Sequence, residues 1–347
     1  MNRFIFIIVM IAITIQTANA QTGPFGGGDG ITEATAFEIY TKAHLEELAD
    51  SVNNNPTNSL GSWSKGKYFQ LMNDITDTIR TIIGNAPYTH LFEGHFNGNN
   101  FKIVLGIDTA AISFNMYTVI GLFGVIRNGT IINLRTEGYV KYSSYNSVAT
   151  VWIGGIAGTV SDNNYDKPTI FKNCINSCDV YFEGQCFRLL GPGGITGSAH
   201  NCIIENCINT GNMYSTSNSD TWGAGGIIGG VGYGITIKKC INIGFVGNES
   251  FAGGIAGACN NFDTLKIDDC INIGFVKGKY RVGGILGNTR QQPAIVTNCI
   301  NAGFIEGNES IGGIVGYALN NNTVITNCIN TGIIEGEESV GGITGDE

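Results

Sequence analysis

Few residues of this sequence have the types and spacing that chemistry requires. The chain has four His: His44, His90, His95 and His200. The run His90-Leu-Phe-Glu93-Gly-His95 is one residue out of register with the H-x-x-E-H pattern of a zinc peptidase. Gly94 and Asn97 favour a turn instead of the helix that such a pattern needs. We therefore predict no metal site in this run.

Residues for nucleophilic or glycosidic catalysis are equally sparse. A Ser or Cys nucleophile needs a His and an orienting carboxylate, but no G-x-S-x-G elbow occurs, and His200 is flanked by Ala199 and Asn201, neither of which is a nucleophile or a carboxylate. A glycosidase needs paired carboxylates on one face. The acidic pairs Asp268-Asp269 and Glu337-Glu338 fall at outward or loop positions and do not recur as a column. We therefore predict a protein without catalytic residues, cofactor or metal.

The ten Cys admit two interpretations. In an exported chain they would form disulfides, but six of them recur at intervals of 29 to 33 residues, where a small buried hydrophobe suits a stacked column. These six are Cys174, Cys207, Cys240, Cys270, Cys299 and Cys328. We favour reduced thiols in this column. The other four (Cys178, Cys186, Cys202 and Cys259) are expected to be more open, and Cys178 could pair with Cys186. Metal binding is not favoured, because no C-x₂-C occurs.

The same interval organises the rest of the chain. Cys-Ile-Asn begins at each of the six recurring Cys, and Gly-Gly-Ile-x-Gly begins at 154, 193, 225, 253, 283, 312 and 341. A period of about 30 residues indicates a stacked repeat architecture. The units consist of short β-branched runs separated by Gly and Asn, which predicts strands. Neither the apolar stripe of helical solenoids nor the leucine-rich spacing is present.

We therefore predict an all-β fold, namely a right-handed parallel β-helix (β-solenoid) of about 8–9 coils. Three short strands per coil would place equivalent residues above one another. The inward columns would be the recurring Cys, an Asn column and an Ile column. The Asn column is Asn176, Asn209, Asn242, Asn272, Asn301 and Asn330, and the Ile column is Ile156, Ile195, Ile227, Ile255, Ile285, Ile314 and Ile343. We expect the Asn to occupy left-handed corners and bond between coils, and the Gly pairs to supply corners that need positive φ or a close backbone approach.

The repeated units resemble a known family. Gly-Gly-Ile-x-Gly and Asn-Cys-Ile-Asn-x-Gly are similar to the GLUG-motif repeats of bacterial surface proteins, and Gly121-Leu-Phe-Gly124 matches the core of that motif most literally. Phe96 to Ile103 resembles the segment that commonly precedes such repeats. The resemblance covers residues 30–347. It implies a β-helical protein that is secreted or exposed on the cell surface, and it brings no catalytic residues.

The N-terminal region divides into a signal and a cap. Residues 1–20 have a positive start at Arg3, an apolar run and the small-residue site Ala18-Asn-Ala20, which predicts a secretory signal peptide. Residues 21–66 are expected to form a flexible lead-in and an N-terminal cap with a short strand and a helix over 41–52, for which Thr41 is the N-cap. Residues 67–347 would be the β-helix. No later segment could span a membrane.

The end of the chain predicts a fragment, and the net charge limits the classes of partner. The chain stops directly after a complete Gly-Gly-Ile-x-Gly unit, so we expect a truncated fragment, because a bare coil leaves its last strands unpaired. The formal net charge is −9 and the isoelectric point is near 5.0. Such an acidic chain without a basic cluster is a poor partner for nucleic acid. Glycans or proteins of a host or neighbouring cell surface are the expected partners.

One outward column has a binding interpretation. Phe245, Phe275 and Phe304 occupy the same repeat position and would form an external ridge, which either stiffens the sheet or binds sugar rings or a partner protein. We therefore predict a non-enzymatic, secreted or cell-surface, adhesin-like binding module or stalk. Two alternatives remain: a carbohydrate-active enzyme on the same scaffold, and a passive spacer attached to a missing functional domain such as a peptidase.

Overall fold

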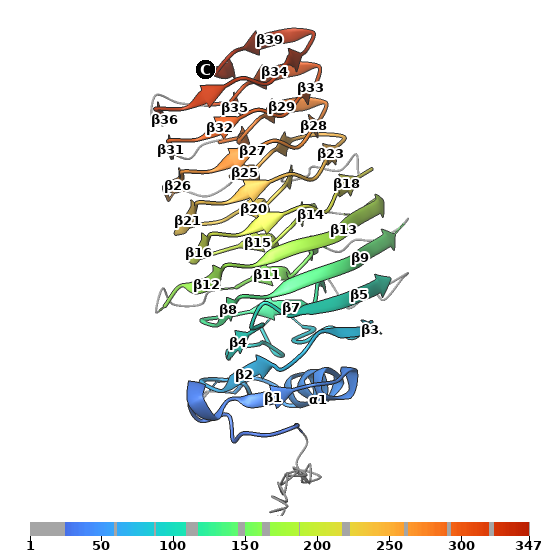
Figure 1. Ribbon diagram of the computed structural model, residues 1–347. Helices are drawn as coiled ribbons and strands as arrows, with labels where there is room; N and C mark the ends of the chain where they lie inside the picture. The colour runs from blue at the N-terminus through green and yellow to red at the C-terminus, as the bar shows by residue number, and fades with distance from the viewer. Residues whose placement is uncertain are drawn as a thin grey trace, which may run out of the picture.

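Short strands that recur once per repeat are stacked along one axis in the computed structural model (Figure 1). The structure describes residues 25–58, 61–86, 88–108, 117–144, 150–161, 167–186, 188–216, 223–259, 263–289, 293–318 and 323–346. The expected signal peptide, residues 1–20, lies outside the described residues. The predicted β-solenoid is confirmed, because each strand pairs in parallel with the equivalent strand of the next coil.

The strands form four long parallel sheets. The first sheet has ten strands: β1 (Phe37–Ile39), β2 (Tyr68–Leu71), β4 (His95–Asn97), β8 (Thr130–Ile132), β12 (Thr169–Lys172), β16 (Cys202–Glu205), β21 (Ile235–Lys238), β26 (Leu265–Asp268), β31 (Ala294–Thr297) and β36 (Val324–Thr326). The third sheet has eight: β6 (Tyr117–Ile120), β10 (Thr150–Gly154), β14 (Arg188–Gly193), β19 (Ala224–Gly225), β24 (Ala252–Gly253), β29 (Tyr280–Gly283), β34 (Glu309–Gly312) and β39 (Glu338–Gly341).

The fourth sheet also has eight strands: β7 (Phe123–Ile126), β11 (Ala157–Val160), β15 (Thr196–Ala199), β20 (Ile228–Val231), β25 (Ala256–Cys259), β30 (Leu286–Asn288), β35 (Val315–Tyr317) and β40 (Thr344–Asp346). The chain passes through the sheets in order, for example from β12 through the second sheet to β14 and β15. A coil therefore has four sides where the sequence predicted three strands. The additional side arises because the Gly-Gly-Ile corner turns the chain between the third and fourth sheets.

The second sheet has fourteen strands, and the length of its strands changes along the solenoid axis. Its early strands are unbroken: β3 (Ile75–Ile79), β5 (Lys102–Asp108), β9 (Arg135–Ser144) and β13 (Ile175–Gly184). Later coils contain two short strands in place of each long one, and both pair with the strands above and below. The first of each pair is β17 (Ile208–Asn209), β22 (Ile241–Asn242), β27 (Ile271–Asn272), β32 (Ile300–Asn301) or β37 (Ile329–Asn330). The second is β18 (Met213–Ser215), β23 (Val246–Asn248), β28 (Val276–Lys277), β33 (Ile305–Glu306) or β38 (Ile334–Glu335).

The predicted N-terminal cap is confirmed. Helix α1 (Lys42–Asn53) lies at the N-terminal end of the stack (Figure 1), and the Thr41 side chain accepts a hydrogen bond from the His44 amide. Leu45, Leu48 and Val52 of α1 are fully buried in the solenoid core. The core therefore continues into the cap, and its open N-terminal end is covered.

The lead-in differs from the expectation. From Phe25 onward it is not a flexible tether: Phe25 is 3% exposed, and the amide of Gly26 donates to the carbonyl of Glu38. A one-turn 3-10 helix, η1 (Glu33–Thr35), follows and leads into β1. Since β1 pairs with β2, the segment that the sequence assigned to the cap already supplies the first strand of the first sheet.

Candidate functional site

The backbone conformation at the corner between the first and second sheets determines which of the following side chains point into the core. In the seven coils from β8 onward, the residue directly before the corner has a φ between 52° and 58°: Asn133, Asn173, Asn206, Lys239, Asp269, Asn298 or Asn327. Asn and Asp tolerate this left-handed conformation. The sequence analysis assigned it to the wrong Asn, because the Asn of Cys-Ile-Asn lies in an extended strand three residues later.

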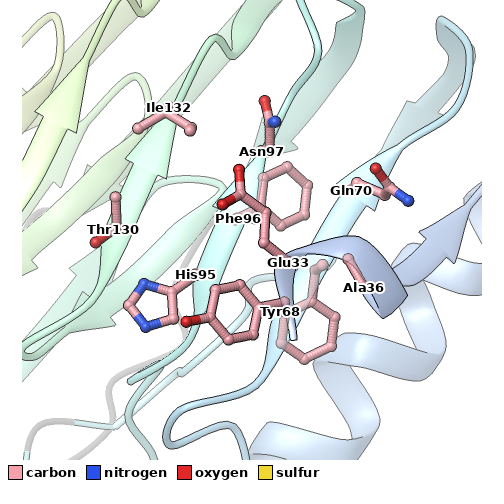
Figure 2. A pocket seen from close by; sticks show the side chains of 10 residues that line it. Glu33, Ala36, Tyr68, Gln70, His95, Phe96, Asn97, Thr130 and Ile132 are labelled. Atoms are coloured by element: carbon pink, nitrogen blue, oxygen red, sulfur yellow. The ribbon is translucent and has the colours of Figure 1, made fainter. Parts of the chain in front are cut away.

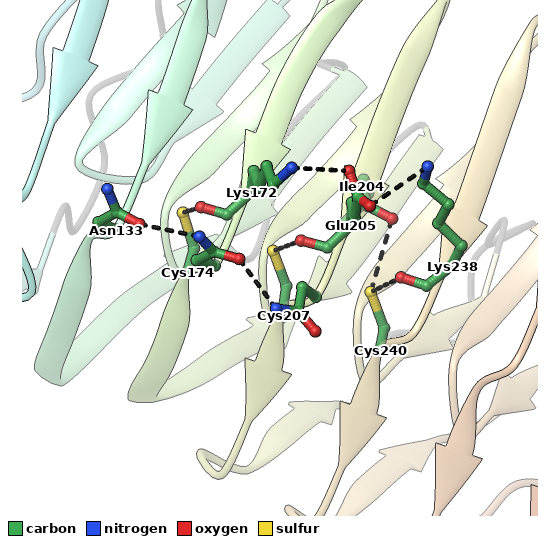
Figure 3. A network of polar contacts seen from close by, with 10 residues as sticks. Asn133, Lys172, Cys174, Ile204, Glu205, Cys207, Lys238 and Cys240 are labelled. Carbon is green, nitrogen blue, oxygen red and sulfur yellow. Dashed lines mark hydrogen bonds and ion pairs between the residues drawn. The ribbon is translucent and has the colours of Figure 1, made fainter.

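The recurring Cys lie just inside this corner (Figure 3). Cys174, Cys207, Cys240, Cys270 and Cys299 are fully buried, and Cys328 of the last coil is partly exposed. Each thiol lies near a carbonyl two residues earlier in its own coil, as Cys207 does to Glu205 at 3.3 Å. The thiol of Cys240 is also 3.6 Å from the carbonyl of Ile204 in the preceding coil. The Cys thiol is small and is a weak hydrogen-bond donor, so at this position it links neighbouring coils without adding volume to the core.

The Asn column forms a continuous chain of amides inside the solenoid. The side-chain nitrogen of Asn176 donates to the Asn209 oxygen at 2.8 Å, and the same 2.8 Å bond continues to Asn242. It then passes through Asn272 and Asn301 to Asn330. Each amide also donates to the carbonyl two residues later, as Asn242 does to Gly244 at 2.9 Å. Buried polar groups are stable when satisfied in this way.

The Gly pairs are explained by close approach, since none of the described ones has positive φ. The α-carbon of Gly226 lies against the amide of Asn242, and that of Gly254 against Asn272, so that any side chain on these Gly would overlap the Asn column. The Ile after each pair points into the core: Ile156, Ile195, Ile227, Ile255, Ile285 and Ile314 are fully buried. Ile343 of the last coil is 39% exposed.

The remaining Cys contradict the expectation of openness. Cys178, Cys202 and Cys259 are fully buried and Cys186 is 6% exposed, and all ten Cys are free thiols. Cys178 is inward because β13 is straight, so the alternation that buries Cys174 and Asn176 continues through it. Burial raises the pKa of the Cys178 thiol to about 12 and also raises the pKa of Cys202 and Cys259. Such thiols are poor nucleophiles and poor metal ligands.

The strongest candidate for binding is the phenylalanine ridge, defined as Phe245, Phe275 and Phe304. Each ring precedes a strand of the second sheet (β23, β28 and β33) and is partly exposed. The ring centroids of Phe245 and Phe275 are 5.3 Å apart, and those of Phe275 and Phe304 are 5.1 Å apart. The three rings therefore form one contiguous aromatic surface across three coils.

Neighbouring side chains widen the ridge. Ile243 and Ile273 are 46% and 49% exposed two residues before the first two rings, and Ile333, in the equivalent position to Phe304 one coil later, is 68% exposed. At the N-terminal end of the ridge, the ring centroids of Tyr214 and Phe245 are 6.4 Å apart. The sequence analysis missed these residues, although comparing the third position after each recurring Cys would have shown Ile243 and Ile273. An exposed apolar surface of this kind is typical of an interaction site.

Polar residues bound the ridge. In the two coils before the ridge, the position of Phe245 is occupied by Asn212 and then by Asp179. The Phe245 amide donates to the Asn212 side-chain oxygen at 3.1 Å, and the Asn212 backbone amide donates to the Asp179 carboxylate at 2.8 Å. Beside the ridge, Lys277 forms an ion pair with Glu306 at 2.6 Å. An apolar centre with a polar rim is the common composition of protein interfaces.

The His and Glu of the metal-like run have separate partners. Glu93 is buried, and its carboxylate oxygen lies 2.9 Å from Arg127 Nε. His90 contacts the Thr89 hydroxyl at 3.0 Å, whereas His95 stacks on Tyr68 with centroids 4.6 Å apart. Among the described residues no group of three or more His, Cys, Asp or Glu is placed to hold a metal ion.

Acidic residues are arranged differently from the expectation in the last two coils. Asp268 accepts bonds from Thr297 at 2.7 Å and Asn298 at 2.9 Å, which lower its pKa. Glu309 and Glu338, however, are register partners, and so are Glu306 and Glu335. Acidic residues therefore do recur as short columns there, which the sequence analysis excluded.

The comparisons agree with this repeat geometry. Residues 307–335 match the family described as "The GLUG motif". Because Ile305 is the register partner of Ile334, the match spans one complete turn of the solenoid, from β34 to β38. This one turn matches the GLUG motif. The resemblance that the sequence indicated is confirmed for it, and the GLUG turn has the same sheet order as the turns before it.

One solved structure has the same fold over most of the chain. It is the crystal structure of a "putative immunoglobulin A1 protease" from Bacteroides ovatus, with a TM-score of 0.52 and 19% sequence identity. The match covers 92% of this chain and 88% of that one. At this identity the likeness concerns the fold alone. No curated protein matches the sequence. In the part of the chain that the structure describes, no helix is long and apolar enough to cross a membrane.

Proposed function

We propose that the protein is a non-enzymatic, exported β-solenoid that acts as an adhesin-like binding module through the phenylalanine ridge. The observation that carries the proposal is the contact of three partly exposed rings in consecutive coils, flanked by exposed Ile243 and Ile273. The occupant would be a protein or glycan of a host or neighbouring cell surface. The apolar run and cleavage site of residues 1–20 support export to that location.

The scaffold suits this role. Consecutive coils hold Phe245, Phe275 and Phe304 at a fixed spacing, because Val246, Val276 and Ile305 directly after them are fully buried. Rings on such a rigid support lose little conformational entropy when a partner binds. The ridge also runs along the axis, so a partner could extend over several coils.

The test uses the mature chain, residues 21–347, against arrayed glycans and immobilised extracellular-matrix proteins. Phe275→Ser removes the central ring, and Tyr139→Ser removes a ring that is 40% exposed on the same sheet outside the ridge. We expect binding to be lost in the first variant and kept in the second. Binding that survives Phe275→Ser would refute the ridge as the binding surface, and polysaccharide cleavage by the purified chain would refute the non-enzymatic assignment.

A passive spacer remains the competing hypothesis. It is favoured by the Bacteroides ovatus protein of similar fold, which is described as a protease although this chain has no peptidase motif of its own. A spacer binds nothing through its coils. Absence of binding by the mature chain to every arrayed glycan and matrix protein would therefore support the spacer and contradict the module.

A further inference from the structure

A pocket lies far from the ridge, on the outer face of the first sheet (Figure 2). Its floor consists of outward side chains of β2, β4 and β8, and Glu33 of η1 reaches over it from the N-terminal segment. Its volume is about 130 Å³. A cavity of about 150 Å³ holds one benzene-sized ring, so this volume suits one ring-sized group.

The segment above the pocket is held in place before any ligand arrives. One carboxylate oxygen of Asp29 accepts a bond from the Thr35 hydroxyl at 2.6 Å and another from the Ile31 amide at 2.9 Å. These two bonds lower the pKa of Asp29. The carbonyl of Gly30 in turn accepts from the Tyr68 amide at 3.0 Å, which joins the segment to β2. The backbone that carries Glu33 is therefore preorganised over the sheet, and this reduces the entropic cost of binding.

The lining combines aromatic surface with mixed hydrogen-bonding groups. Its side chains with polar atoms are Glu33, Tyr68, Gln70, His95, Asn97 and Thr130. Figure 2 shows the Glu33 carboxylate between the stacked rings of His95 and Tyr68 on one side and the Asn97 and Gln70 amides on the other. Burial is the main cause that lowers the pKa of His95; nearby Lys167 lowers it further and Glu33 raises it, so that the net shift favours the neutral imidazole. Of the described residues that line the pocket, none is Lys or Arg.

We propose that this pocket binds one neutral sugar residue of a glycan. Neighbouring hydroxyls of a sugar donate and accept at once, which matches the Gln70 amide, a neutral imidazole, two hydroxyls and one carboxylate. The Asn97 amide contributes its N–H groups, because its oxygen already accepts from the Asn99 amide and the Asn133 side chain. The apolar face of the sugar ring would lie against the edge of the Tyr68–His95 pair. Anionic ligands are disfavoured, because the lining has a carboxylate and no cationic side chain.

An ammonium group is the main competitor, since Glu33 and Tyr68 could hold one by charge and ring contact. An ammonium ligand has no acceptor for the N–H groups of the Gln70 and Asn97 amides, whereas a sugar hydroxyl does. The observations therefore favour the sugar.

The experiment is saturation-transfer difference NMR on the mature chain with a panel of neutral methyl glycosides, and with choline as the ammonium probe. We expect transfer to at least one glycoside and none to choline. Glu33→Gln and Gln70→Leu should each weaken the affinity by about tenfold, because each removes a hydrogen bond to a confined hydroxyl. Asp29→Ala should weaken it as well, since the segment carrying Glu33 loses its two bonds.

Matched controls keep the test decisive. Glu46→Gln changes a carboxylate on α1 outside the pocket, and Thr236→Leu changes an outward residue of β21 farther along the same sheet. Both should bind as the unaltered chain does. No transfer to any glycoside, transfer to choline in its place, or unchanged affinity in both Glu33→Gln and Gln70→Leu would overturn the proposal. The ridge variants leave this pocket unchanged, so a glycan that still binds Phe275→Ser but is lost in Glu33→Gln is assigned to the pocket, and one with the opposite pattern is assigned to the ridge. The two binding proposals therefore fail independently.

Discussion

The α-carbon of Gly226 lies against the side-chain amide of Asn242, one turn of the solenoid away from the equivalent contact between Gly254 and Asn272. The Gly pairs and the Asn of Cys-Ile-Asn, which are separated in the sequence, are therefore two halves of one packing arrangement. A Gly is required because the amide fills the space that a side chain would occupy, and the amide stays in place because it bonds to the coils on both sides.

The first prediction follows from this contact. Gly226→Ala should lower the free energy of unfolding by about 1–3 kcal/mol, because the new methyl group overlaps the Asn242 amide and the Gly254 carbonyl. Gly342→Ala is the matched control: Gly342 occupies the same motif position in the last coil, where a Cβ would meet nothing within 4 Å. Urea denaturation of both variants measures the difference. Equal stabilities would show that the amide column can move aside.

The second prediction concerns the contribution of the ridge to stability. The rings of Phe245 and Phe275 are 5.3 Å apart and tilted by 56°, so a double-mutant cycle to Ala should give a coupling energy of about 0.5–1.5 kcal/mol. Phe245 and Phe304 are separated by the ring of Phe275, and their cycle should be additive. Additivity in both cycles, measured by urea denaturation, would mean that the rings stack without stabilising the fold.

The repeat itself was predictable because its spacing makes positions equivalent. Once Ile255, Ile285 and Ile314 occupy the same place in successive units, stacking buries them together, and the confirmed solenoid follows. The direction that the chain takes at a corner was harder to predict from the sequence. It depends on a single left-handed residue, and Asn298 before the corner and Asn301 after it are equally good candidates by residue type.

Of the two candidate sites, one could be predicted from the sequence and the other could not. The phenylalanine column could be predicted from the period, whereas the pocket could not, because Glu33 and Thr130 are about a hundred residues apart and meet only after β1, β2, β4 and β8 have paired. Cys178 was misjudged for a related reason. Its burial depends on β13 remaining straight, while the equivalent segment of the next coil divides into β17 and β18.

The third prediction concerns the ion pair between Arg127 and Glu93. Their side chains are 13% and 4% exposed, and the carboxylate also accepts a bond from the Ser62 amide. Glu93→Leu should therefore destabilise the protein by about 3–5 kcal/mol, because Arg127 is left as a buried charge without its partner. Glu46→Leu is the control, since its contact with Lys42 is 3.7 Å long and exposed, and its removal should change stability by less than about 0.5 kcal/mol. Thermal or urea unfolding would decide, and similar values for both variants would contradict the structural role of Glu93.

The fourth prediction concerns the redox state of the Cys. All ten are free thiols in the structure, and of these only Cys328 is more than slightly exposed. A thiol-alkylating reagent should therefore modify at most Cys328 in the folded chain, and all ten after unfolding in urea without reductant. Mass spectrometry counts the modified residues. Fewer than six modified thiols in the unfolded chain would contradict a reduced Cys column.

The last prediction is a pH dependence that originates at Cys178. Burial raises the pKa of this thiol to about 12 in the folded chain, whereas an unfolded Cys titrates near pH 8.5. Its contribution to stability is therefore fully present below about pH 8.5 and is lost as the pH rises toward 12. Over that window the unfolding free energy should fall by about 1.4 kcal/mol per pH unit for this one thiol. Other groups also titrate there, so the informative quantity is the difference between the unaltered chain and Cys178→Ala, each unfolded in urea with reductant at pH 8, 9 and 10. The stabilities of the two proteins should converge as the pH rises, because the variant has no thiol at position 178 to ionise on unfolding. Parallel stability curves would mean that water reaches the thiol in the folded state and that this part of the core is more open than its packing indicates.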